Sequence, residues 1–282
     1  MHQIAAHPPL PLRFVQELSR HPAEVLRSEL ADVWLAAPAS IKPMEIPVRE
    51  PQFFPGASGL LDSLDWNDVV PCARHAGPPF PPWRPGGVLV VAHNFSSAAK
   101  YDEVCSRDRD VTHLAASWNG LKQILIEANI GPSEVFLTNA ILGAPRDLAT
   151  GDQGAVKVPD AYRDCCVAFL AREMTLFAPS VVLAFGSVAT EYVGRAVLRL
   201  CHSNDVTSSG AITSWAESST FTLLDNMDAA VVRVSGPDMT LVALTHFSRG
   251  KGNSHHRKFD GVSGWAAEVK MIQAARSPRP PR

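Results

Sequence analysis

The chain of 282 residues has few of the features that mark disulfide-rich, zinc-binding or membrane-spanning proteins. Its five cysteines are odd in number and no two form a CxxC pair, which argues against a disulfide framework or a zinc ribbon. The longest apolar runs, such as residues 87–92, have the length of a strand and not of a bilayer span. Neither a Walker loop nor a dinucleotide fingerprint occurs in the sequence.

A large excess of charge is also missing, because 26 basic and 28 acidic residues leave a formal net charge of −2. This balance argues against a protein that coats polyanions with its whole surface, although a DNA enzyme needs only a local basic patch. The stretch MHQIAAHPPLPLR lacks the charged-then-apolar layout of a secretory signal. We therefore expect a cytoplasmic protein without a membrane partner, and we expect it to be a monomer.

Proline divides the chain into two parts, since fifteen of the 23 prolines precede residue 86. Because proline fixes φ and removes a hydrogen-bond donor, residues 38–85 are predicted to form an irregular wrap or linker. Apolar residues at helical spacing predict one or two helices within 14–35. We expect a helical and proline-rich extension at 1–85, an α/β domain at 86–275 and a disordered tail at 276–282.

The second part alternates short apolar runs with helical patterns. Strands are predicted at 88–92, 135–139, 181–185 and 241–245, and weaker strand signals occur within 223–234. Helices are predicted at 113–129 and 160–177, and a third begins at the glycine turn of residue 186. This alternation predicts a three-layer α/β/α sandwich with a mostly parallel, four-stranded central sheet. Such sheets bind ligands at the carboxyl ends of their strands.

Polar residues follow three of these strands, in AHNFSS, FLTNA and THFSRG. Each motif alone fits ordinary turn chemistry. Together they bring two amides and an imidazole to one edge of the sheet, a set that suits recognition of a planar heterocycle and stabilisation of developing negative charge.

The motifs also resemble, in order, those of the uracil-DNA glycosylase superfamily. The resemblance covers about residues 86–260 and comprises VLVVAHNFSS, WNGLKQILIEANIGPSEVFLTNAILGA, CCVAFLAREMTLFAPSVVLAFGSVA and LVALTHFSRG. The chain looks most like the family-four branch. The resemblance implies a DNA partner and a monofunctional glycosylase that hydrolyses the N-glycosidic bond of a flipped-out uracil or 5-modified pyrimidine, leaving an abasic site.

Four site residues follow from the resemblance. Asn94 matches the residue that positions the attacking water, and His246 matches the residue that hydrogen-bonds the pyrimidine O2 as the bond breaks; these two are the implied catalytic residues. Asn139 matches the asparagine that recognises the pyrimidine edge. Trp118 fits the aromatic residue that stacks on the flipped base.

The chain departs from the family-four branch at its iron–sulfur cluster. Cys166 fits one of the four cluster cysteines, but Gly143 stands where another is expected and the N-terminal CxxC is missing. We therefore expect no cluster and no other cofactor. His255 and His256 lack carboxylates or cysteines at a matching spacing, so we expect no metal either.

A second departure bears on the substrate. Strict uracil enzymes carry a tyrosine two residues beyond the catalytic position, where it blocks C5 substituents, and this chain has Ser96. We hypothesise that the site admits 5-substituted pyrimidines, including hypermodified cytosine of phage DNA, as an anti-phage defence would require. In the alternative, Phe95, which replaces the usual proline, or the proline-rich segment closes the same space. We expect Tyr101 to line the site with Phe95 and Ser96.

A basic loop follows His246, and we expect it to contact DNA phosphates and to fill the position of the extruded base. A solvated surface loop is the alternative. The residues concerned are Ser248, Arg249, Lys251, Arg257 and Lys258.

Two other functions stay open. The fold could serve a non-catalytic protein that binds DNA or a modified base, because AHNFSS and HFSRG are atypical motifs. It could also serve a nucleoside hydrolase that acts on free metabolites, although the basic loop favours a polymer.

Overall fold

The computed structural model describes a core and several shorter pieces of the chain. The core comprises residues 85–93, 115–145, 158–203, 230–234, 238–246 and 254–277, and the shorter pieces are residues 29, 33, 35–39, 41–42, 59–60, 66, 212–213 and 215. In this part of the chain, no helix is both long enough and apolar enough to cross a membrane.

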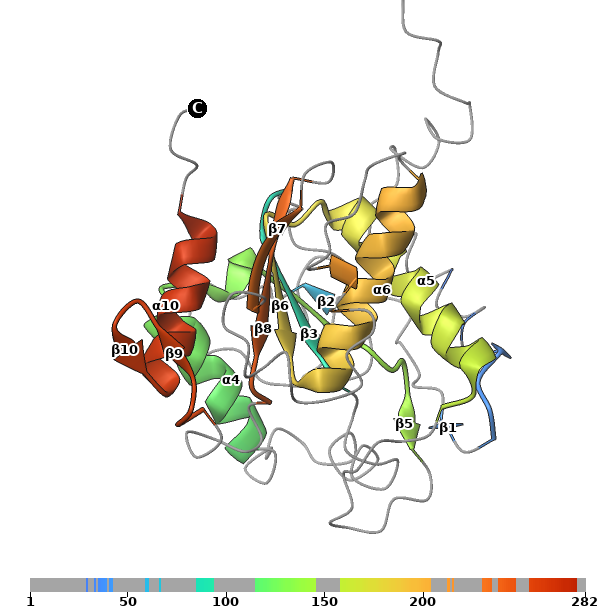
Figure 1. Ribbon diagram of the computed structural model, residues 1–282. Helices are drawn as coiled ribbons and strands as arrows, with labels where there is room; N and C mark the ends of the chain where they lie inside the picture. The colour runs from blue at the N-terminus through green and yellow to red at the C-terminus, as the bar shows by residue number, and fades with distance from the viewer. Residues whose placement is uncertain are drawn as a thin grey trace, which may run out of the picture.

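A six-stranded sheet forms the centre of the molecule, in the order β2-β4-β3-β6-β8-β7 (Figure 1). The inner strands are mutually parallel, and the two edge strands run antiparallel to their neighbours. The bounds are Gly59–Leu60 for β2, Val135–Asn139 for β4, Val88–Ala92 for β3, Val181–Phe185 for β6, Met239–Leu244 for β8 and Val231–Val234 for β7.

Helices cover both faces of this sheet. The helices α5 (Asp160–Phe177) and α6 (Ser187–Ser203) pack on each other over one face, and α6 also contacts β6 and β3. On the other side, α10 (Trp265–Arg276) packs on β8 and β6 and contacts α4 (Ala115–Glu127) (Figure 1). The predicted α/β/α sandwich with a mostly parallel sheet is confirmed. The expected four strands are the inner, parallel ones, and the two antiparallel edges enlarge the sheet to six.

The remaining elements are short. The antiparallel pairs are β1 (Ile41–Lys42) with β5 (Ala144–Pro145), and β9 (Lys258–Phe259) with β10 (Val262–Ser263). A single 3-10 turn, Pro132–Glu134, leads into β4.

The inner strands are buried along their whole length, which is why they appear in the sequence as continuous apolar runs. Side chains alternate between the faces of a strand, and contacts with α5 identify the two faces of β4. Phe136 stacks on Phe177 of α5 with ring centroids 3.8 Å apart, and the Thr138 side chain hydrogen-bonds Glu173 of the same helix. Asn139 therefore belongs to the opposite face, on the side of α4 and α10.

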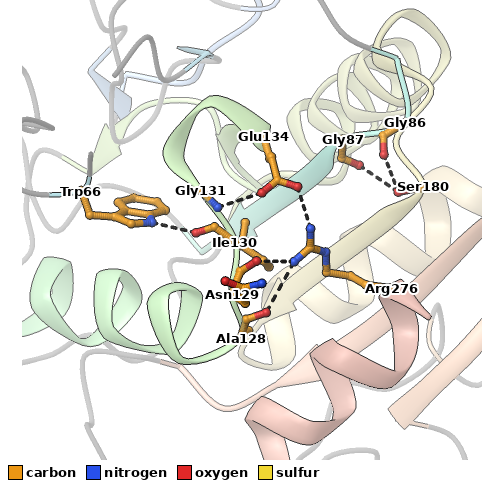
Figure 2. A network of polar contacts seen from close by, with 10 residues as sticks. All are labelled: Trp66, Gly86, Gly87, Ala128, Asn129, Ile130, Gly131, Glu134, Ser180 and Arg276. Atoms are coloured by element: carbon orange, nitrogen blue, oxygen red, sulfur yellow. Dashed lines mark hydrogen bonds and ion pairs between the residues drawn. The ribbon is translucent and has the colours of Figure 1, made fainter. Parts of the chain in front are cut away.

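Parts of the predicted N-terminal extension join this core. The strand β2 pairs with β4, and the buried indole of Trp66 donates a 2.7 Å hydrogen bond to the carbonyl oxygen of Ile130 (Figure 2). Glu29 forms a 3.0 Å ion pair with Arg172 of α5. Most of the expected helices at 14–35 and of the proline-rich wrap lies outside the described residues.

The end of α10 is tied to the turn between α4 and β4. Arg276 donates to the carbonyl oxygen of Asn129 at 2.5 Å and pairs with Glu134 at 2.6 Å, and Glu134 also accepts from the backbone N–H of Gly131 (Figure 2). Asn129 has a left-handed φ of 57°, which asparagine tolerates better than most residues. Arg276, assigned to the tail from the sequence, is thus the last residue of a docked helix.

Candidate active site at the strand ends

The predicted site residues Asn139 and His246 lie at the same edge of the sheet. Asn139 ends β4, and His246 lies two residues beyond the end of β8. The strands β3 and β6 lie between these two, so three strand spacings separate them at the backbone, about 14 Å in all. Both residues therefore lie at the carboxyl edge of the sheet, which is where open α/β sheets bind ligands.

The side-chain amide of Asn139 is buried at the end of β4. Its side chain is almost wholly buried, and Nδ2 has no hydrogen-bond partner among the residues that the structure describes. A buried polar group without a partner costs about 1–3 kcal/mol. The backbone around it is fixed, because Ala140 donates to the carbonyl oxygen of Ala92 at 2.7 Å and Ile141 donates to that of His93 at 3.0 Å. A donor that is held rigidly and is unpaired among the described residues suits recognition of a ligand.

His246 packs against the glycine turn between β6 and α6. Gly186 has a φ of +89° and donates a 2.8 Å hydrogen bond to the carbonyl oxygen of Leu244. A Cβ atom added at Gly186 would lie 3.3 Å from Cβ of His246 and 3.4 Å from its Cδ2. The glycine is therefore required twice, for its backbone conformation and for the close approach of the histidine.

A buried ion pair supports the chain just before His246. The Glu268 carboxylate accepts from the backbone N–H of Thr245 at 2.8 Å and from its hydroxyl at 2.9 Å. Arg257 lies 3.4 Å from the same carboxylate and donates to the carbonyl oxygen of Ala243 at 2.5 Å. Burial raises the pKa of Glu268, and the contacts with Thr245 and Arg257 oppose that shift.

This arrangement corrects the prediction for Arg257. The side chain is 0% exposed, whereas a contact with DNA phosphate requires an exposed guanidinium. The guanidinium instead forms a buried ion pair with Glu268. Lys258, the next residue, is exposed and stays available for such a contact. Ser248, Arg249 and Lys251 lie outside the described residues.

The remaining predicted residues are only partly described. Trp118 lies in α4, on the side of the sheet that Asn139 faces, but its side chain is outside the described part of the chain. Asn94, Phe95, Ser96 and Tyr101 lie outside it altogether.

His93, which directly precedes Asn94 in the motif AHNFSS, has no predicted role in the site. Its Nε2 is buried and has no hydrogen-bond partner in the described part of the chain. Burial lowers the pKa of this imidazole from 6.5 to about 4, so the ring is neutral at physiological pH. Its position directly after a predicted strand, within the polar motif AHNFSS, is the sequence signal that could have identified it.

Two positions that correspond to cluster ligands in the family-four branch, Cys166 and Gly143, lie in the described part of the chain. Cys166 is buried on α5 beside Tyr162, and burial raises the pKa of its thiol to about 11. Gly143, at the second expected position, offers no ligand. His255 and His256 are exposed and their rings contact each other edge-on at 5.2 Å. Within the described ranges, no three His, Cys, Asp or Glu side chains are grouped to hold a metal ion.

A three-layer α/β fold with polar groups at the carboxyl ends of parallel strands belongs to the open-sheet class, which binds ligands at that edge. The family model described as "Uracil DNA glycosylase superfamily" matches residues 102–250, more than half of the chain. The chain belongs to this superfamily. The match includes Trp118, Asn139 and His246 and begins after Asn94. A comparison with curated proteins finds no match.

Gly186→Ala should displace His246. The added Cβ must push the imidazole by a few tenths of an ångström, in addition to a backbone strain of about 1–3 kcal/mol. We expect shifted NMR signals of the His246 ring together with a lower free energy of unfolding. Gly86→Ala is the matched control, because Gly86 has a φ of +87° and open space at the position of a Cβ. Equal His246 signals in both variants would contradict the close approach.

His93 should make stability depend on pH. Its pKa is lower in the folded than in the unfolded chain, so its contribution to stability is present above about pH 6.5 and is lost as the pH falls toward 4. Between about pH 7 and about pH 5 the loss amounts to about 2 kcal/mol. Urea unfolding of the wild type and of His93→Gln at both pH values measures it. The variant should lack this component, and exposed His256→Gln should retain it; identical pH profiles for the wild type and His93→Gln would refute the assignment.

Proposed function

We propose that the protein is a monofunctional DNA glycosylase that hydrolyses the N-glycosidic bond of a flipped-out uracil or 5-modified pyrimidine and leaves an abasic site. The observation that carries the proposal is the placement of two side chains at one sheet edge of a uracil DNA glycosylase superfamily chain. They are the buried amide of Asn139, whose Nδ2 has no partner among the described residues, and the imidazole of His246. We further propose that it acts as a cytoplasmic monomer.

The reaction needs a base outside the stack, because the glycosidic carbon is shielded in a duplex. As the C1′–N1 bond breaks, positive charge develops on the sugar and negative charge on the pyrimidine. In this proposal His246 donates a hydrogen bond to O2 of the leaving base. The loss of one such donor typically lowers the rate by about 10²–10³-fold. The tight packing of His246 on Gly186 supports this role, since a preorganised donor needs a fixed position.

Water completes the reaction by adding its oxygen to C1′, while its proton balances the charge of the released base. Asn94 would hold this water. An amide is a weak base, so its contribution would be positioning more than proton removal.

Asn139 would recognise the base. The carboxamide carries a donor and an acceptor and can match either a carbonyl or an amino group on the pyrimidine edge. Trp118 would stack on the base, a role supported by the position of α4 on the side that Asn139 faces.

The DNA backbone would be bound by the loop after His246. Arg257 is excluded from this role by its burial, which leaves Ser248, Arg249, Lys251 and the exposed Lys258. A short basic loop on a protein of net charge −2 suits a local contact with phosphates around one extruded nucleotide.

Incubation with oligonucleotides that contain uracil or a 5-modified pyrimidine, followed by alkali, tests the proposal. The wild type should give strand breaks only after alkali, and His246→Ala should slow excision by about 10²–10³-fold. Exposed His256→Ala serves as the control and should act like the wild type. Tight binding without breaks, unchanged in Asn94→Ala, would establish a binding protein instead, and base release from free nucleosides alone would establish a nucleoside hydrolase.

The size of residue 96 should set the substrate range. A serine leaves room beside C5 of the base, and we propose that hypermodified cytosine of phage DNA is among the substrates, in an anti-phage role. Mass spectrometry of bases released from uracil-containing, unmodified and phage DNA should detect 5-substituted bases with the wild type and Ser96→Ala. Ser96→Tyr should release uracil alone. The idea fails if the wild type releases only uracil and Ser96→Tyr behaves identically, in which case Phe95 or the Pro-rich segment closes the space; Tyr101 would line it in either case.

A further inference from the structure

Each of the two described site residues follows a buried threonine that is bonded to a buried glutamate. Thr138 precedes Asn139 at the end of β4, and its side chain hydrogen-bonds Glu173 of α5. Thr245 precedes His246 after β8, and it donates twice to Glu268 of α10. Glu173 is 0% exposed and Glu268 is 1% exposed. The same pair of residue types therefore occurs twice, from helices on opposite faces of the sheet.

Glu268 fixes the chain at the point where it leaves the sheet, and we call this contact with Thr245 the Glu268 anchor. Thr245 lies just outside β8, so its N–H has left the sheet, and the carboxylate accepts that N–H at 2.8 Å. The second oxygen accepts the hydroxyl at 2.9 Å. Because one rigid carboxylate grips both groups of Thr245, it fixes the peptide that leads into His246. Arg257 holds the carboxylate in turn and bonds the carbonyl oxygen of Ala243.

The Glu173 anchor is the hydrogen bond between Glu173 of α5 and Thr138, and it fixes the end of β4 from the α5 side of the sheet. Burial raises the pKa of Glu173 well above its usual range, and the Thr138 hydrogen bond opposes the shift. The neighbouring stack of Phe136 on Phe177 joins the same strand to the same helix. The position of α5 therefore determines the position of Thr138, the residue directly before Asn139.

These two glutamates are costly to bury. Moving a carboxyl group out of water costs several kcal/mol, and well-packed apolar residues in its place are often neutral or stabilising. A gain in overall stability therefore does not explain the pair. Their shared location, one residue before each polar side chain of the site, does explain it, because catalytic and binding groups lose efficiency when they move by about 1 Å.

We propose that Glu173 and Glu268 are positioning residues, which hold Asn139 through Thr138 and His246 through Thr245. The consequence for function rests on the proposed glycosylase activity, whereas the consequence for the positions of the two side chains does not. Since the anchors act from separate helices, each should affect its own site residue. Glu268 should govern the rate of bond cleavage, and Glu173 should govern discrimination between bases.

The test compares Glu268→Gln and Glu173→Gln in the full chain with Glu191→Gln as the control. Glu191 forms a 2.9 Å ion pair with Arg195, one turn further along α6. NMR of the imidazole signals, with His246 assigned by loss of its peaks in His246→Ala, should show a shift in Glu268→Gln and none in Glu173→Gln or Glu191→Gln. Single-turnover excision should slow by about 10-fold or more in Glu268→Gln. Glu173→Gln should change the ratio of excision rates between two bases by a similar factor.

Thr245→Val and Thr138→Val remove the hydroxyls with little change of shape, and each should reproduce the effect of the corresponding glutamate variant. These two variants also test the proposal if a glutamate variant does not fold. Thr245→Ser should restore the wild-type His246 signals. The proposal is overturned if neither glutamate variant changes these readouts, or if both change the His246 signals equally, as general loosening would do. Absence of base release by the wild type would refute the proposed function alone, because the imidazole signals still report on positioning.

Discussion

The register of the four parallel strands is the constraint on which the rest of the structure depends. Backbone pairing sets Ala92 opposite Asn139 and Phe185 opposite Leu244, so the strand ends align without any contact between the polar side chains that follow them. A strand that slipped by one residue would turn every side chain to the other face, placing Leu137 and Asn139 against α5 and Thr138 away from Glu173. Because all four strands are buried on both faces, apolar packing opposes such a slip.

A second theme is the use of polar groups inside the core. Arg257 and Glu268 form a buried ion pair next to β8. Glu173 is buried between α5 and β4, and burial lowers the pKa of His93 so that its ring is neutral at physiological pH. Burying a polar or charged group costs more free energy of folding than burying an apolar group of similar size. A gain in stability therefore does not explain why these groups are buried. All of them lie within two residues of a site strand end or bond to a residue that does. These four buried groups therefore lie around the strand ends that carry the proposed site.

Sequence patterns were sufficient for the parallel core. The strands at 88–92, 135–139 and 181–185 and the helix at 160–177 have the predicted bounds, because a doubly buried strand must be continuously apolar. The last strand ends at Leu244 and not at residue 245, since Thr245 bonds Glu268 in place of a strand neighbour. The strand β2 has only two residues and offers no pattern, and the helix α10, with Glu268 within its buried face, was not predicted.

The site was foreseen to a similar extent. Strand-end logic locates Asn139 and His246 correctly at one edge, but partners distant in sequence, such as Glu268, leave no local signal in a chain read alone. Arg257 illustrates the limit most clearly: four cations within ten residues suggest a surface for phosphates, yet one of them is turned inward by a glutamate eleven residues away. Its withdrawal leaves a smaller basic surface on a protein of net charge −2. In the proposed function, affinity for DNA would then depend less on overall charge and more on contacts to the extruded nucleotide, and Glu173 and Glu268 would position the side chains that make those contacts.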